Sequence, residues 1–193
     1  MNRGRIRGGC CPCVIALFCM LFSPPAIAQD AAFETPLSKA DSAFREGRFD
    51  AAERLSRQAF HEVRGQAGLA TQETIGALSL LARSLLAQGR GAEALALLVD
   101  VVPRLEAALG PDNLLTLKVV SLASEAFEAT GDIAQAAEYS AWAALGRQDA
   151  LGPDHPDTLA SSGDTALLLD KMGETGTAVV VLTDVVARRV AIL

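Results

Sequence analysis

The chain has 193 residues, of which 23 are acidic and 17 are lysine or arginine, and its formal net charge is −6. Half of the residues are hydrophobic, whereas 5% are aromatic. A chain with this acidic balance is a poor candidate for binding nucleic acid or anionic membrane surfaces.

Residues 1–28 are predicted to be a cleaved signal peptide. Three arginines give the start a positive charge, an apolar run follows at 14–22, and Ala26 and Ala28 form a small-x-small cleavage site. The apolar run is shorter than the ~20 residues that a membrane-spanning helix needs, which disfavours a membrane anchor. We therefore expect cleavage after Ala28, a periplasmic or secreted protein, and no stable membrane span.

The predicted mature chain, residues 29–193, has no cysteine, because all four cysteines of the sequence precede Ala28. A disulfide framework, a thiol nucleophile and a cysteine metal site are thereby excluded after processing. Loss of three arginines leaves 14 of the 17 basic residues against 23 acidic ones.

A repeat of 42 residues runs through the mature chain. Four glycines stand at this spacing, and each is followed five residues later by an alanine; the columns are Gly47, Gly89, Gly131 and Gly173, and Ala52, Ala94, Ala136 and Ala178. Two further sets of residues recur every 42 residues: threonines at 74, 116 and 158, and glycines at 68, 110 and 152. A fixed period of this size indicates an α-solenoid of stacked helix hairpins, so the fold class is predicted to be all-α.

Four antiparallel hairpins are expected, over 36–63, 72–109, 114–151 and 156–193. Within each, the first helix ends at the first glycine column, where a tight turn can use positive φ. Thr71, Asn113 and His155 are predicted N-caps of the first helices in the last three hairpins. The alanine column is expected where the two helices approach closely, since a larger side chain would push them apart.

One segment resembles a known repeat family. Residues 151–158 read Leu-Gly-Pro-Asp-His-Pro-Asp-Thr, and 109–112 repeat the beginning of this pattern. The pattern resembles the tetratricopeptide repeat of kinesin light chains and their bacterial relatives. This resemblance implies a right-handed superhelix whose concave face, lined by the first helices, binds extended peptides.

The resemblance also implies which residues face the groove. The expected partner contacts are Arg83, Lys118, Ser121, Glu125, Glu128 and Asp170. Ser121, like Ser79 and Gly163, occupies a position at which the family often has an asparagine that binds the peptide backbone. The groove is then expected to become acidic toward its C-terminal end.

No catalytic, cofactor-binding or metal-binding motif is present in the sequence. His155 is explained as a helix cap, and His61 has no second ligand at helical spacing. The predicted function is therefore a non-catalytic scaffold or adaptor that binds a partner protein or peptide. One alternative is a docking or sensor region of a larger exported protein, such as one with a caspase-like protease domain. Another is a self-assembling structural repeat.

The last helix is expected to take part in an interface. Its many valines spread around more than one face, so packing within the hairpin can cover only some of them. No polar capping helix follows, although repeat arrays usually have one. A homo-oligomer formed through this helix is therefore a further expectation.

Overall fold

The computed structural model describes residues 35–191; the predicted signal peptide lies outside this range. The described part consists of helices without strands, which confirms the predicted all-α fold class. The helices are α1 (Pro36–Arg45), α2 (Phe49–Ala67), α3 (Gln72–Ala87), α4 (Gly91–Leu109), α5 (Leu114–Thr130), α6 (Ile133–Leu151), α7 (Pro156–Lys171) and α8 (Thr175–Ala191).

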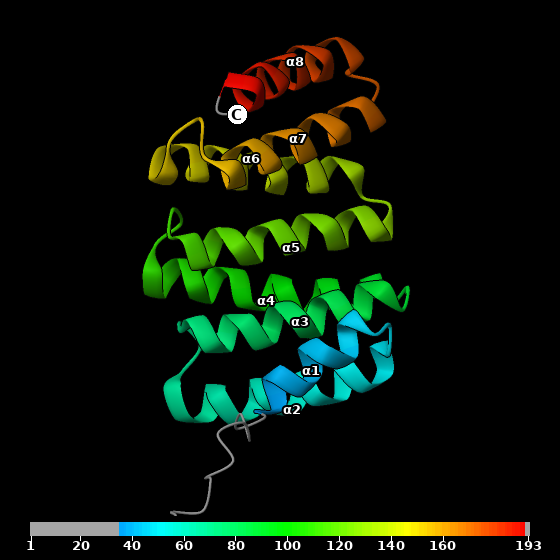
Figure 1. Ribbon diagram of the computed structural model, residues 1–193, viewed down its shortest axis with the longest axis vertical. Helices are drawn as coiled ribbons and strands as arrows, with labels where there is room; N and C mark the ends of the chain where they lie inside the picture. The colour runs from blue at the N-terminus through cyan, green and yellow to red at the C-terminus, as the bar shows by residue number, and fades with distance from the viewer. Residues whose placement is uncertain (1–34, 192–193) are drawn as a thin grey trace, which may run out of the picture. The chain divides into compact units, whose positions relative to one another are not determined.

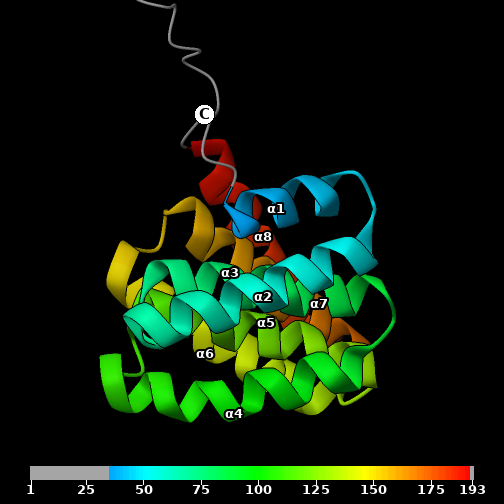
Figure 2. The same ribbon diagram turned by 90° about the horizontal axis from the view of Figure 1, so that it is seen from below.

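The helices form antiparallel hairpins that stack in chain order, with α2 near one end and α8 at the other (Figure 1). The second helices α2, α4 and α6 each pack against their own first helix and against the first helix of the next hairpin, and α8 packs against α7. Figure 2 shows the stack from the end at which α2 lies, with α1 and α4 on opposite sides. The described chain is therefore an α-solenoid.

Glycines with positive φ end most of the helices. Gly131, the C-cap of α5, has φ 90° and ψ 2°, a left-handed conformation that costs other residues free energy. Gly68 has φ 84° and follows α2, which continues to Ala67 rather than ending near residue 63. The glycine at position 65 does not end the helix, because the turn glycine is the one in the repeating column.

Side chains at the N-caps satisfy the free backbone N–H groups of the first helices. Oγ1 of Thr71 accepts from the N–H of Thr74 at 3.2 Å, and Oδ1 of Asn113 accepts from Leu115 at 2.9 Å. Nδ1 of His155 accepts from the N–H of Asp157 at 3.1 Å. The hydroxyl of Thr74 also donates to the carbonyl of Gly68 at 2.8 Å, which ties the connecting loop to α3.

The alanine column lies inside the stack. Ala52, Ala94 and Ala136 are completely buried, and Ala178 is nearly so. Gly91, at the start of α4, shows how close the helices come, because a Cβ there would lie 2.9 Å from Cβ of Ala129. Small residues at these positions thus set the distance between neighbouring helices.

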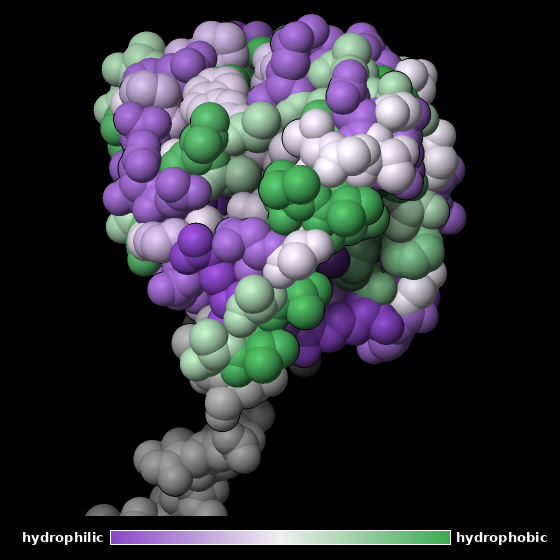
Figure 3. Space-filling view, turned by 90° about the horizontal axis from the view of Figure 1, so that it is seen from above, coloured by the Kyte–Doolittle hydropathy of each residue, from purple (hydrophilic) through white to green (hydrophobic). Residues whose placement is uncertain are grey.

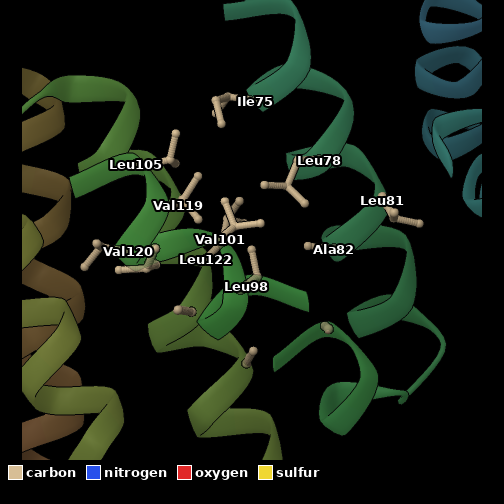
Figure 4. Close-up of a cluster of buried hydrophobic side chains, with 14 of the residues drawn as sticks. Ile75, Leu78, Leu81, Ala82, Leu98, Val101, Leu105, Val119, Val120 and Leu122 are labelled. Atoms are coloured by element: carbon tan, nitrogen blue, oxygen red, sulfur yellow. The ribbon is translucent and has the colours of Figure 1, made fainter. Parts of the chain in front are cut away.

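The main hydrophobic core lies between α3, α4 and α5. Side chains of the three helices point toward one another in Figure 4, among them Leu78, Leu98, Leu105 and Val119, all without exposed surface. Phe60 of α2 and Ala143 of α6 extend this core on its two sides.

The C-terminal part of the stack has polar residues at several positions that are apolar in the main hydrophobic core. One repeat after Leu98 and Leu105 stand Ser140 and Arg147, and Thr165 stands two repeats after Leu81. The hydroxyls of Ser140 and Thr165 are hydrogen-bonded to each other at 2.8 Å. We call Ser140, Arg147, Ser161 and Thr165 the polar seam. The hydrophobic cluster beside it contains only Ala136, Ala137 and Leu168 as buried members among the described residues.

Candidate functional site

A groove runs along the side of the stack formed by the first helices. It consists of two adjoining pockets, which share Ser121 and Glu125 of α5. All six residues that the sequence suggested as partner contacts line these pockets: Arg83, Lys118, Ser121, Glu125, Glu128 and Asp170. The structure thus places them together on one surface, while their role in binding stays a prediction.

The first of the two, which we call the mixed pocket, lies between α1, α3 and α5. It contains the cations Arg83, Lys118 and Arg147, the last of which comes from α6, together with the carboxylates Asp41 and Glu125. The guanidinium of Arg83 lies over the ring of Phe44, 4.9 Å from its centre. This cation–π contact holds Arg83 at the pocket while leaving its N–H groups available.

The second, which we call the acidic pocket, lies between α5 and α7. Its carboxylates are those of Glu125, Glu128, Asp164 and Asp170, and Lys171 is the one cation among its lining residues. Lys171 forms an ion pair with Glu128, which connects the two helices. Helix α5 approaches α7 less closely than it approaches α3. The two helices therefore leave an open space between them, which is the acidic pocket.

Partial burial changes the pKa values of two carboxylates in the acidic pocket, Glu125 and Asp164. Loss of hydration raises the pKa of Glu125; Arg83 opposes this shift, and Asp164 and Glu128 add to it. Desolvation likewise raises the pKa of Asp164, and Arg147 counteracts it. Both groups therefore bind protons more readily than free carboxylates, and a basic ligand group would relieve their repulsion.

Sequence reasoning missed four charged residues of the groove, namely Asp41, Arg147, Asp164 and Lys171. Asp164 stands where the preceding repeats have Leu80 and Leu122, and Arg147 stands where the preceding repeat has the buried Leu105. For Asp164 the available signal was a charge where the two preceding repeats have leucine, whereas the column of Arg147 also contains Arg189. Arg147 was missed because it belongs to a second helix, α6, yet it lines the mixed pocket and is hydrogen-bonded to Ser121 of α5 and Ser161 of α7.

The two histidines lie apart. His61 is exposed on α2 beside the ring of Phe60, and His155 caps α7. Within residues 35–191 no three His, Cys, Asp or Glu side chains are arranged as a metal site. None of the described helices is both long and apolar enough to cross a membrane.

An apolar surface lies on α8. The repeat column that contains Val102, only 2% exposed, continues to Val186, which is 59% exposed. Val179, Val180 and Val190 of α8 are exposed as well. In Figure 3, which shows the α8 end, hydrophobic residues gather near the middle of the face. This face corresponds to the one on α4 that α5 covers.

The comparisons with known proteins agree with this architecture. Residues 73–144 match the family model of the tetratricopeptide repeat. The predicted resemblance is confirmed: the fold is a tetratricopeptide-type solenoid of the kinesin-light-chain-like kind. No curated protein matches the chain.

Two similar solved structures hold nearly identical TPR-like repeats described as a kinesin light chain from Podosopora anserina. The first has a TM-score of 0.73 at 24% identity, over 83% of this chain and 76% of the other. The second, a variant of the same protein with one glutamine replaced by methionine, has a TM-score of 0.72, with the same identity and coverage. Tetratricopeptide repeats generally act as non-catalytic scaffolds that bind proteins.

Proposed function

We propose that the protein is a non-catalytic scaffold that binds a segment of a partner protein in the groove formed by α1, α3, α5 and α7. The observation that carries this proposal is the continuous row of charged and hydroxyl side chains along one side of a fixed helical frame. Such a surface offers polar contacts for a peptide without a reaction centre, and the repeats supply a preformed shape for it.

The charges of the groove set the chemistry of the partner. Four carboxylates and one lysine line the acidic pocket, and that lysine is already paired with Glu128. A partner segment is expected to place lysine or arginine there. Its affinity should decrease as the pH falls through the raised pKa values of Glu125 and Asp164, because protonation removes the charges that attract it.

A displayed library of random peptides tests this proposal, because the selection does not require an identified partner. Selected peptides should be enriched in basic residues and should bind less tightly at high salt. The variant Glu125→Lys with Glu128→Lys should lose that enrichment. A matched double charge reversal, Glu138→Lys with Asp149→Lys, lies on exposed positions of α6 outside the two pockets and should keep it. Equal selection by both variants would move the binding surface away from the groove.

We also propose that the protein is exported and acts in the periplasm or outside the cell. The support is the charged start, the apolar run and the small residues of segment 1–28. Intact mass of the exported protein tests it: the mass should be that of residues 29–193, and a mass that retains the first 28 residues would contradict it.

Self-association through α8 is a second candidate, favoured by the exposed valines described above. The face of α8 around Val186 is equivalent in the repeat to the face of α4 around Val102, which is buried in the stack. An exposed apolar face of this kind favours association. The double variant Val186→Glu with Val190→Glu should be monomeric, whereas Val99→Glu, on α4, should not alter association. Sedimentation that shows the unsubstituted protein to be monomeric at high concentration would rule this candidate out.

A further inference from the structure

The acidic pocket contains a cation that belongs to the protein itself. Lys171 is the last residue of α7, and its Nζ donates to a carboxylate oxygen of Glu128 on α5. Both residues line the pocket, and the pair is open to solvent, with 51% of the lysine side chain and 37% of the glutamate side chain exposed. An ammonium group of the chain therefore lies where the basic group of a partner is proposed to bind.

The two preceding repeats lack this pair. Lys171 stands where α3 and α5 have Ala87 and Ala129, and Glu128 stands where α3 has Leu86. The two charges therefore replace uncharged residues on the two helices that border the acidic pocket. Helices α3 and α5, which approach each other more closely, have no such residues at the equivalent positions.

The first hairpin shows why Lys171 reaches across to another helix. The equivalent cation there, Arg45 of α1, pairs at 2.7 Å with Asp41, which lies four residues earlier in the same helix. The residue four positions before Lys171 is Leu167, which offers no carboxylate. Residues four apart are neighbours on a helix surface, so α7 lacks the acceptor that α1 supplies. The long side chain of Lys171 extends to Glu128 instead.

The pair is suited to exchange its cation rather than to hold the fold together. Exposed ion pairs contribute little to stability, because water screens both charges. Helices α5 and α7 also have a second connection, the guanidinium of Arg147, which donates to Oγ of Ser121 at 2.9 Å and to Oγ of Ser161. Loss of the pair between Lys171 and Glu128 would therefore leave the two helices linked.

An apolar side chain of the pocket indicates which kind of cation fits. Leu167 also lines the acidic pocket, and it is 55% exposed. A lysine or arginine side chain of a partner can lay its methylene groups over Leu167 while its charged end reaches a carboxylate. A small inorganic cation would leave this apolar surface in water. The pocket therefore suits a long basic side chain.

We infer that Lys171 occupies the cation site of the partner in the free protein and is displaced from Glu128 when a lysine or arginine side chain of the partner binds. The inference rests on the proposed function, because it names the residue with which the partner's basic group competes. A single basic residue must replace an existing ion pair, so its net gain is small. Segments with several basic residues are favoured, since Glu125, Asp164 and Asp170 are carboxylates of the same pocket.

The lysine side chains report this displacement directly, because the chain contains only Lys39, Lys118 and Lys171. Reductive methylation with isotope-labelled formaldehyde makes each of them visible by NMR and leaves the charge and one N–H on the nitrogen. The probe is N-acetyl-Gly-Arg-Gly-amide, and N-acetyl-Gly-citrulline-Gly-amide is its neutral counterpart. The arginine peptide should shift the Lys171 signal saturably toward its position in the variant Glu128→Gln, whereas the Lys39 signal should stay in place. The citrulline peptide should shift neither signal.

Substitutions separate competition from general repulsion. Lys171→Met removes the charge but keeps an unbranched side chain, and it should tighten binding of the arginine peptide about two- to fivefold. In a Glu128→Gln background most of this gain should disappear, because the carboxylate for which Lys171 competes is absent. Lys39→Met removes an equal charge outside both pockets and should leave the affinity unchanged.

Two results would overturn the inference: saturable binding of the arginine peptide while the Lys171 signal stays in place, or an equal gain from Lys171→Met with and without Glu128. Basic library peptides that bind the groove without moving the Lys171 signal would refute the displacement and leave the proposed function standing. Displacement of Lys171 by the arginine peptide, without any groove-binding library peptide, would refute the proposed function alone. Failure of both kinds of peptide to bind would refute both.

Discussion

The stack from α2 to α5 and the stack from α5 to α8 share one helical frame, but different side chains fill them. In the first, Leu98 and Leu105 are completely buried in a continuous apolar core. In the second, the equivalent positions hold Ser140 and Arg147. The glycine and alanine columns keep the hairpin geometry in both. The arrangement of the helices therefore depends on the glycines of the turns and the alanines at the helix contacts. The residues at the core positions can differ between repeats, and in the C-terminal region they are polar.

The two regions also treat buried charge differently. Glu53, on α2, is buried but accepts hydrogen bonds from Gln88 at 3.0 Å and Arg90 at 2.6 Å, and pairs with Arg57 at 2.8 Å. Arg147 has hydroxyl and carbonyl partners only. The buried charge of the N-terminal region is paired with cations, whereas the half-buried charge of the C-terminal region is held by neutral groups of α5 and α7.

The largest change in unfolding free energy is expected when Leu105 and Arg147, which are equivalent in the two regions, are each replaced by the other's residue. Leu105→Arg would bury an unpaired charge in the apolar core and should cost about 4 kcal/mol or more of unfolding free energy. Arg147→Leu should be neutral or stabilise the protein by up to about 2 kcal/mol, because it removes a desolvated charge. Urea denaturation measures both. Similar losses for the two variants would mean that the regions do not differ as described.

The alanine column should respond alike in both regions, because the frame is common to them. Ala94→Leu and Ala136→Leu each force a larger side chain between closely packed helices and should cost about 1–3 kcal/mol. Gln148→Glu, at an exposed position of α6, serves as the control and should cost little. Equal denaturation midpoints for all three variants would refute the role of the column.

Much of this frame could be predicted from the sequence. Glycines recur because the turns need positive φ, and alanines recur because the helices approach closely, so both constraints leave columns. Gly68 belongs to such a column and marks the end of α2, although the end was expected earlier. The ion pair between Glu128 and Lys171 could not be predicted, because it depends on how far α5 and α7 are held apart. Arg147 is visible as a change from the leucine of the preceding repeat, but its reach into the groove depends on the polar seam.

Glu53→Gln should cost about 1–3 kcal/mol at neutral pH, because it removes the charge that Arg90 and Arg57 pair with. Burial raises the pKa of Glu53, but the hydrogen bonds from Gln88, Arg90 and Arg57 outweigh it and lower the pKa overall. The stabilisation is therefore present above the unfolded-state pKa of about 4.3 and is lost as the pH falls through the lower folded-state value. Denaturation at pH 7 and pH 3 should show the difference from the unsubstituted protein shrinking in acid; a constant difference would contradict the ionic explanation.

Asp164→Asn should change the unfolding free energy least, and it should raise that free energy where Glu53→Gln lowers it. The pKa of Asp164 is raised in the folded state, so its favourable contribution exists below the unfolded pKa of about 3.9 and is lost as the pH rises through the raised value. The substitution should stabilise the protein by less than about 1 kcal/mol at pH 7, since the side chain is exposed, and by nothing at pH 3. An equal gain at both values of pH would show that charge is not the cause.

Native-state hydrogen exchange tests the central contrast most directly. If the polar seam weakens the stack beyond α5, the backbone amides of α7 and α8 should exchange through local opening, at free energies well below that of global unfolding. Core amides of α3, α4 and α5 should exchange only through global unfolding. In the variant Arg147→Leu, the exchange free energies of α7 should rise toward those of these core amides. Uniform exchange free energies from α3 to α8, unchanged by that substitution, would contradict the account.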